Sequence, residues 1–300
     1  MTPAAGLSCY TSALHAYLSL EWKATEIISR SVHLAVRRDR AHEQLSFSHH
    51  SPSLDVLPDG SHLEYLSGST YDVLDALSNE LLRYGRAIVV TDTARLPWSV
   101  GHGGPSAPHW ILLDGCSDQR WSIRDKFCAL VPNGQQQPWS GELSDAELIE
   151  AMTLPADWRP VQSTRNKLVF GAPVPVPAGP MMWLRRHGGI AAIHALRCED
   201  GWQFGDTAID ALVEDFQADD TRFFRSMDDL WAAAGHHGFA LRWQREVAST
   251  DRERQALSPR IDRWEALPKV LRIAQESVLR GRPRPSLVES ALGALRSEPQ

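Results

Sequence analysis

The stretch from Thr70 to Asp92 changes from helical to strand periodicity within a few residues, and this change limits the possible folds more than any other feature. Its first part, TYDVLDALSNELLRY, has apolar residues at three-to-four spacing, with Thr70 or Asp72 as a start signal and Gly85 as a stop signal. The apolar run AIVV follows and predicts a buried strand. HWILLDG and RWSIRD then predict two more strands, joined by the turn CSDQ as a hairpin. The chain is therefore expected to have an α/β fold of the α+β type.

Two regions precede this core. Residues 9–38 carry apolar residues at helical spacing and predict one or two helices. Residues 46–69 are rich in Ser, His, Pro and Gly and predict a polar surface loop, which could carry a short hairpin and form one wall of a site.

A domain boundary is expected at residues 131–142, where Pro, Gly and Gln replace periodic apolar residues. We therefore expect a catalytic domain at 1–133 and a mainly helical domain at 141–300. The second domain is expected to hold a helix at 144–152, a Pro-rich connector at 170–183, a helix at 188–200 and a last helix interrupted by Pro268.

Composition excludes several classes of function. The 300 residues carry 31 Lys and Arg against 37 Asp and Glu, so the net charge of −6 does not suggest a nucleic-acid-binding surface. No apolar run reaches the roughly 18 residues that span a bilayer, and the N-terminus lacks a basic signal-peptide region, so no membrane partner and a cytoplasmic location are expected. The four cysteines follow no zinc pattern and are expected to be thiols.

Two other motifs have ordinary explanations. The histidines His49, His50, His62 and His102 have irregular spacing and no paired acidic ligand, so they predict a solvated loop, and no metal is expected. The segment GHGGPS at 101–106 lacks the Lys-Ser/Thr of a phosphate-binding loop.

Three polar residues stand where nucleophilic catalysis would need them. Cys9 begins a predicted helix, where exposed N–H groups and the helix dipole would favour the thiolate. His109 opens one strand of the predicted hairpin and Asp125 closes the other, so pairing would bring base and orienting carboxylate together. Cys9 could instead be a small core residue, and Asp114 competes with Asp125 but is better explained as a turn former before Gly115.

This order of elements resembles the bacteriocin-processing cysteine peptidases of papain-like fold. More closely, LLRYGRAIVVTDTARLPW followed by HWILLDG and SIRD resembles the N-terminal domain of the butirosin biosynthesis protein H (BtrH) family. In that family a "D-x-x-x-LP-aromatic" stretch follows the strand, and here Asp92, Leu96, Pro97 and Trp98 match it. The match covers residues 6 to about 130, and the later region fits the family's helical C-terminal half by layout.

The resemblance implies transfer of an acyl group from the thioester of an acyl carrier protein or peptidyl carrier protein to a small-molecule amine in natural-product biosynthesis. It implies Cys9 as nucleophile, His109 as general base and Asp125 as the carboxylate that orients it. No cofactor is expected besides the 4'-phosphopantetheine on the carrier. The residues before Cys9, TPAAGLS, lack the Gln that supplies an oxyanion donor in papain-like peptidases. The Cys9 backbone N–H and a second donor would form the oxyanion hole, with the His-rich loop as one source.

Other residues are candidates for binding substrate. Asp92 could position His109 or an amine, or it could form an Asx-type turn. Trp98 and Trp110 could line an acyl channel or pack in the core. Gly103 and Gly104 lie in a loop next to His109 that could admit the pantetheine arm.

Arg185 and Arg186 could dock an acidic carrier protein or be ordinary surface arginines. The helical region is expected to shape the acceptor pocket. Two alternatives to acyl transfer stay open. The same triad could act as a thioesterase or cyclising release enzyme, or the fold could be a retired hydrolase that serves as a non-catalytic binding module.

Overall fold

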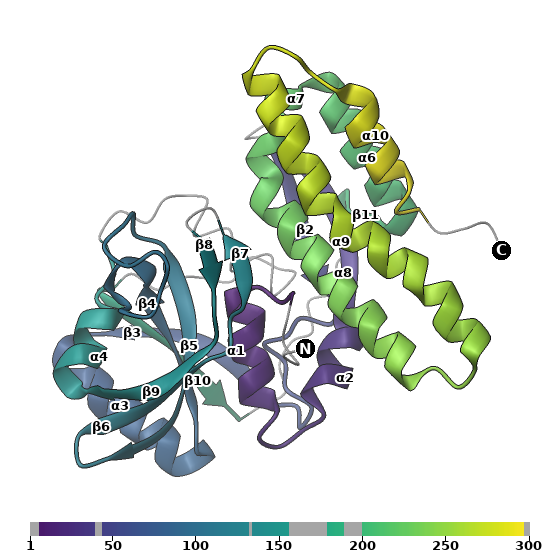
Figure 1. Cartoon of the computed structure of the whole chain (residues 1–300). Coiled ribbons are helices and arrows are strands. Elements are labelled where there is room, and N and C mark those ends of the chain that lie inside the picture. Colours follow the sequence, from purple (N-terminus) through teal and green to yellow (C-terminus); the bar gives the residue numbers. More distant parts are fainter. Residues whose placement is uncertain (1–5, 40–43, 132–133, 156–178, 189–199, 297–300) are drawn as a thin grey trace. The chain divides into compact units, whose positions relative to one another are not determined.

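The computed structural model describes residues 6–39, 44–131, 134–155, 179–188 and 200–296. These residues form two compact units (Figure 1). Unit 1 contains the described residues of 6–25, 54–155 and 179–188, and unit 2 contains those of 26–53 and 200–296. The chain is a mixture of helices and antiparallel sheets, as the change of periodicity predicted.

Unit 1 is built on a six-stranded antiparallel sheet with the strand order β3-β10-β4-β5-β6-β9. Its strands are β3 (His62–Gly68), β4 (Ala87–Asp92), β5 (Pro108–Ser117), β6 (Arg120–Asp125), β9 (Trp139–Ser144) and β10 (Met181–His187). Between β6 and β9 in the sequence, β7 (Ala129–Val131) and β8 (Gly134–Gln136) form a separate two-stranded ribbon. Its helices are α1 (Cys9–Leu18), α3 (Thr70–Tyr84) and α4 (Asp145–Met152), with the short η1 (Thr93–Arg95).

The two faces of the large sheet pack against different helices. Val89 and Ile111 share a core with Val73 of α3 and Leu148 of α4. Because side chains alternate along a strand, Trp110 points to the opposite face, and there it stacks on Tyr10 of α1. Nine of the ten residues of α1 are buried, so this helix is enclosed on all sides. A helix held so firmly keeps its first residue, Cys9, in a defined place.

The β5–β6 hairpin contains a bulge that decides which side chains share a face. Near its two-residue turn, Asp118 and Gln119 both have positive φ, and Ser117 pairs with Arg120. The register shifts by one residue between Leu113 and Gly115. A one-residue shift of register changes which side chains of the two paired strands lie on the same face from that point on. Beyond the bulge Leu113 pairs with Ile123, which places His109 and Asp125 on the same face of the sheet.

Unit 2 packs helices around a three-stranded antiparallel sheet with the order β11-β1-β2. Its elements are β1 (Val32–Asp39), β2 (Gln44–His50), β11 (Gln203–Phe204), α6 (Gly205–Ala218), α7 (Asp220–Phe223), η3 (Phe224–Ser226), α8 (Met227–Val247), α9 (Asp251–Leu279) and α10 (Pro285–Gly293). α2 (Ala24–Ser31) carries the chain from unit 1 into unit 2. No helix in the described part of the chain is long and apolar enough to cross a bilayer.

Several expected elements differ in the structure. Residues 32–39, expected to be helical, form β1, because pairing with β2 outweighs the helical spacing. Residues 46–69, expected to be a polar loop, contain most of β2 and all of β3, and His49 and His50 are only 1% exposed. The predicted interruption at Pro268 is also wrong. α9 continues through Pro259 and Pro268, and the burial of Trp264, Leu267 and Leu271 on both sides of Pro268 outweighs the lost hydrogen bond.

The division into units also differs from the expected domains. The expected boundary at 131–142 lies inside unit 1, because β9 pairs with β6 across it. β10 then returns to fill the place between β3 and β4. Residues 26–53, expected in the first domain, supply two strands to unit 2. The helix at 144–152 is confirmed as α4, whereas most of the Pro-rich connector and the expected helix at 188–200 lie outside the described residues.

Unit 2 encloses a cluster of histidines. His236 of α8 is 1% exposed, and its ring centroid lies 4.8 Å from that of His50 and 5.5 Å from that of His49. Burial lowers the pKa of His236 to about 3 and the pKa of His33 to about 4. Burial, neighbouring histidines and Arg260 of α9 lower the pKa of His237 to about 3. The folded unit therefore holds these rings in the neutral form.

We expect unit 2 to lose stability in acid. A histidine in the unfolded chain takes up a proton below about pH 6.5, whereas folded His236 resists protonation down to about pH 3. The unfolded state binds more protons between these values, so the free energy of unfolding falls as the pH falls. The loss at pH 5 is about 2 kcal/mol for such a histidine. Urea unfolding at pH values from 8 to 5, followed by circular dichroism, measures this loss in the free energy of unfolding. His236→Gln should reduce the change in the free energy of unfolding between pH 8 and pH 5, whereas exposed His102→Gln should not. An equal change in both variants would contradict the prediction.

Candidate active site

Cys9 is the first residue of α1, and a capping side chain fixes this helix start. Ser8 has an extended backbone, and its Oγ accepts a hydrogen bond from the Thr11 backbone N–H at 3.2 Å. Such a cap sets the position at which the helix begins. The first amides of a helix have no acceptor within the helix, so the end that carries Cys9 favours negative charge. The sequence prediction that Cys9 opens a helix is confirmed.

His109 and Asp125 form a buried pair next to Cys9. His109 lies at the start of β5 and Asp125 at the end of β6, and they are 4% and 1% exposed. The distance from His109 Nε2 to Asp125 Oδ2 is 2.8 Å. A hydrogen bond also links the His109 ring to Cys9. Because Nε2 of the His109 ring is hydrogen-bonded to Asp125, Nδ1 is the ring nitrogen that can bond to the Cys9 thiol. The structure thus brings together the three residues predicted from the sequence.

The electrostatics of this pair favour the charged forms of both side chains. Burial alone would lower the pKa of His109, but the Asp125 charge and hydrogen bond, together with Cys9, raise that pKa to about 10. Burial alone would raise the pKa of Asp125, but the His109 charge and hydrogen bonds from His109, Trp98 and the Phe127 backbone hold that pKa below its usual value. An imidazolium next to a thiol stabilises the thiolate, which is the nucleophilic form.

Trp98 holds the Asp125 carboxylate. Its indole N–H donates to Asp125 Oδ2 at 2.9 Å, and the Phe127 backbone N–H donates to Oδ1 at 3.0 Å. The Trp98 ring stacks on Trp139 with the centroids 3.8 Å apart and the planes 3° apart. Trp98 was expected to line an acyl channel or pack in the core. Trp98 does pack against the core of the large sheet. Its hydrogen bond to Asp125 also gives it a positioning role, which nothing in the sequence indicated beyond its place in the LP-aromatic stretch.

Asp92 closes the loop that carries Trp98. Its Oδ1 accepts hydrogen bonds from the backbone N–H groups of Ala94 at 3.0 Å and Ala107 at 3.2 Å, and its Oδ2 accepts from Ser106 Oγ at 2.6 Å. These contacts favour the Asx-turn interpretation of Asp92 over a direct role toward an amine. They join the end of β4 to the residues just before His109, so the loop that holds Trp98 is anchored at both ends.

The remaining substrate-binding candidates fall into two groups. Gly103 and Gly104 lie exposed in the loop closed by Asp92, and Gly103 has φ +69°, which favours glycine. Trp110 is buried under Tyr10, and its indole N–H donates to Tyr65 Oη at 2.9 Å. Trp110 therefore packs in the core, and the expectation that it lines a channel has no support in these contacts. Tyr65 did not appear among the sequence candidates because its segment was expected to be a loop.

Arg185 and Arg186, the candidates for docking a carrier protein, are engaged within unit 1. Arg185 pairs with Glu64 on the neighbouring strand. The Arg186 side chain is 8% exposed, pairs with Glu21 and Asp59, and lies over the Trp22 ring at 5.2 Å. Arg186 is thus part of the packing of this unit.

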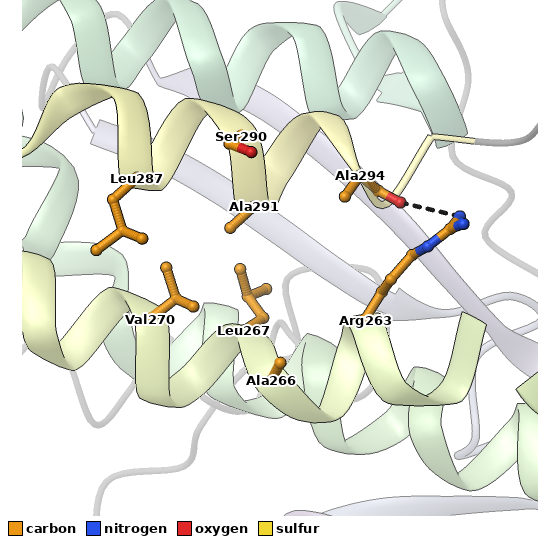
Figure 2. A pocket seen from close by; sticks show the side chains of 8 residues that line it. All are labelled: Arg263, Ala266, Leu267, Val270, Leu287, Ser290, Ala291 and Ala294. Carbon is orange, nitrogen blue, oxygen red and sulfur yellow. Dashed lines mark hydrogen bonds between the residues drawn. The ribbon is translucent and has the colours of Figure 1, made fainter. Parts of the chain in front are cut away.

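The described residues hold no arrangement for a metal ion, and the cavity drawn in Figure 2 belongs to unit 2. Among the residues that the structure describes, no group of three or more His, Cys, Asp or Glu is arranged to hold a metal ion. Cys116 is exposed, Cys128 is partly buried, and Cys198 lies outside the described residues. A cavity of about 260 Å³ in unit 2 lies between α9 and α10, where Leu267, Val270 and Leu287 line it and Arg263 closes one end (Figure 2). Its lining contains no Cys, His, Asp or Glu.

We expect Cys9 to react at a pH where ordinary thiols do not. The His109 imidazolium persists below about pH 10 and is lost above it, so the thiolate next to it is favoured across the neutral range. The rate of alkylation of Cys9 by iodoacetamide should be nearly constant from pH 6 to pH 9, measured by peptide mass spectrometry. In His109→Ala the rate should fall about tenfold for each pH unit below about 8.5. The same fall in the unmodified protein would contradict an ion pair.

Replacing Trp98 should slow the alkylation of Cys9 without abolishing it. Trp98→Phe deletes the hydrogen bond to Asp125 and keeps an aromatic ring on Trp139. A hydrogen bond to a charged group contributes about 1.5–3 kcal/mol, so alkylation at pH 6 should be about tenfold slower. Trp139→Phe is the matched control, because it changes the same stack but leaves the indole–carboxylate bond. Equal rates for both variants would show that the bond does not position Asp125.

Comparison of the chain with protein-family models and with curated proteins gave no match.

Proposed function

We propose that this protein is a cysteine-dependent acyltransferase that takes an acyl group from the thioester of a carrier protein and passes it to an amine. The observation that carries this proposal is the buried His109–Asp125 pair hydrogen-bonded to Cys9 at the start of α1. A nucleophile, a base and an orienting carboxylate in contact are the minimum for acyl chemistry on a thiol. A buried helix that starts at the nucleophile and packs on an antiparallel sheet carrying the base also supports a papain-like fold.

The proposed first step transfers the acyl group to Cys9. The Cys9 thiolate attacks the thioester carbonyl carbon and forms a tetrahedral intermediate with a negatively charged oxygen. This intermediate collapses, the bond to the pantetheine sulfur breaks, and the His109 imidazolium protonates the leaving thiolate. The products are an acyl-Cys9 thioester, a free pantetheine thiol and a neutral His109.

The proposed second step transfers the acyl group to the amine. The amine nitrogen attacks the acyl-Cys9 carbonyl, and neutral His109 accepts the proton that the nitrogen loses. Collapse of the intermediate breaks the carbon–sulfur bond to Cys9, and the amide leaves. Cys9 thiolate and His109 imidazolium are then restored, held by Asp125 and Trp98. The cycle needs no metal or redox group.

A thioester suits this site better than a peptide bond. Residues 2–8 before Cys9, TPAAGLS, contain no Gln or Asn, so this stretch lacks the side-chain amide that papain-like peptidases place a few residues before the nucleophile. An amide is a poor electrophile and depends strongly on oxyanion stabilisation, whereas a thioester is activated already. A free thiol persists most readily in a reducing compartment, and we propose the cytoplasm as its location.

The test is the mass of the intact protein after mixing with acyl-pantetheine thioesters of several chain lengths. An acyl adduct is expected on the unmodified protein and on Cys116→Ala, and it should be absent from Cys9→Ala. Adding amines should remove the adduct and yield an amide. Loss of the adduct to free acid, with no amide from any amine, would contradict transfer and identify a thioesterase. No adduct with any donor, together with a Cys9 that resists iodoacetamide, would leave only the binding-module interpretation.

A further inference from the structure

We propose that the acyl chain of the thioester substrate is apolar and that it binds against the ribbon formed by β7 and β8 (Figure 1). This inference rests on the proposed function and names the class of acyl group that it transfers. The residues assigned to the selection of the chain are Leu130 of β7 and Val100, which lies in the loop that carries Trp98.

The segment that leads into the ribbon contacts the candidate catalytic pair directly. The Phe127 backbone N–H donates to Asp125 Oδ1 at 3.0 Å, and the Phe127 ring centroid lies 5.6 Å from that of His109. Leu130 follows Phe127 by three residues, a stretch of chain that spans at most about 11 Å. The ribbon therefore begins next to the two side chains that act on the thioester in the proposed reaction.

The other end of the ribbon is fixed to the loop that carries Trp98. Gln136 is 2% exposed, and its side-chain Oε1 accepts a hydrogen bond from the Val100 backbone N–H at 3.1 Å. The Val100 side chain lies beside the ribbon, since a Cβ on Gly134 would be 4.0 Å from Val100 Cγ1. The loop is in turn joined to Asp125 by the Trp98 indole. Both ends of the ribbon are thus tied to the same carboxylate, and a surface fixed in this way loses little freedom when it binds a ligand.

The surface that the ribbon and Val100 present is apolar and carries no charge. Leu130 is 60% exposed and Val100 is 37% exposed. Residues 127–141 contain no Lys, Arg, Asp or Glu, although charged residues make up 23% of the chain. Removing exposed apolar side chains from water is favourable, whereas a charged ligand would find no ion-pair partner on this segment. The surface therefore favours an apolar group.

The acyl chain is the group that this surface suits among those that the proposed reaction brings together. The pantetheine arm contains amides and a hydroxyl, and the acceptor contains an amine, so both need polar partners when they leave water. An alkyl chain needs none, and it is attached to the carbonyl carbon that Cys9 attacks. Each methylene group that is fully buried strengthens binding about fourfold, so a longer chain should react faster than acetyl.

The experiment measures how the rate of Cys9 acylation depends on the length of the acyl chain. Acetyl-, butyryl- and octanoyl-pantetheine are each mixed with the protein below saturation, and adduct formation is followed by intact-protein mass spectrometry. Octanoyl-pantetheine should react at least about tenfold faster than acetyl-pantetheine. Leu130→Ser and Val100→Ser should each slow the octanoyl reaction about fivefold and leave the acetyl reaction within about twofold.

Leu82→Ser is the matched control. Leu82 lies on α3 and is 84% exposed, so this variant makes the same chemical change at an exposed leucine outside the ribbon. It should keep the full preference for the octanoyl chain. Alkylation of Cys9 by iodoacetamide at pH 6 is measured for every variant, and an unchanged rate shows that the His109–Asp125 pair is intact.

Each other outcome overturns the assignment. If the unmodified protein has no preference for the longer chain, or if Leu130→Ser and Val100→Ser retain that preference, the ribbon does not bind the acyl chain. If these variants slow the acetyl reaction and alkylation as much as the octanoyl reaction, the ribbon only supports the His109–Asp125 pair. These results would leave the proposed acyltransferase standing. If no donor forms an adduct although Cys9 is alkylated at pH 6, the proposed function fails and this inference fails with it.

Discussion

The hydrogen bond between His109 and Asp125 is the interaction on which the candidate site depends. A carboxylate that is 1% exposed is costly to bury unless its oxygens are fully engaged. Asp125 meets this condition with three donors: the His109 ring, the Trp98 indole and the Phe127 amide. The Asp92 loop holds Trp98, and the stack on Trp139 restricts its ring. These contacts together keep the Asp125 carboxylate buried and oriented toward His109.

The register of the β5–β6 hairpin shows how a small backbone irregularity determines whether His109 and Asp125 can meet. Ser117 pairs with Arg120 next to the turn, and continuing this register would pair Asp125 with Leu112. Asp125 would then lie on the face opposite His109, because side chains alternate along a strand. The one-residue bulge between Leu113 and Gly115 reverses this and puts the two side chains on one face. Asp114 lies at the bulge and pairs with Arg124, so it is neither the orienting carboxylate nor part of the hairpin turn.

The sequence predicted which residues meet at the candidate site better than it predicted the organisation of the chain. Cys9, His109 and Asp125 could be found because each stands at the end of a strongly patterned element. Trp98 could not be assigned its contact with Asp125, since its partner lies on β6 and the pairing of distant strands leaves no local pattern. For the same reason the insertion of β10 between β3 and β4, and the strands that residues 26–53 supply to unit 2, were missed. Local periodicity reports an element, whereas the unit to which it belongs depends on long-range pairing.

Buried histidines in the two units show how a neighbouring carboxylate sets the charge of a buried ring. His236 and His109 are both nearly inaccessible to solvent, and burial acts on both in the same direction. For His236 burial alone decides the outcome and its pKa falls to about 3, whereas the carboxylate next to His109 reverses the effect and its pKa rises to about 10. The opposite charge states follow mainly from the Asp125 carboxylate, with Cys9 acting in the same direction, because the interaction of a close charged pair exceeds the desolvation of the ring. A histidine motif therefore indicates chemistry only when the fold also supplies the carboxylate. In this chain the hairpin bulge places that carboxylate next to His109, whereas burial and neighbouring histidines, with Arg260 for His237, lower the pKa values of the unit 2 cluster.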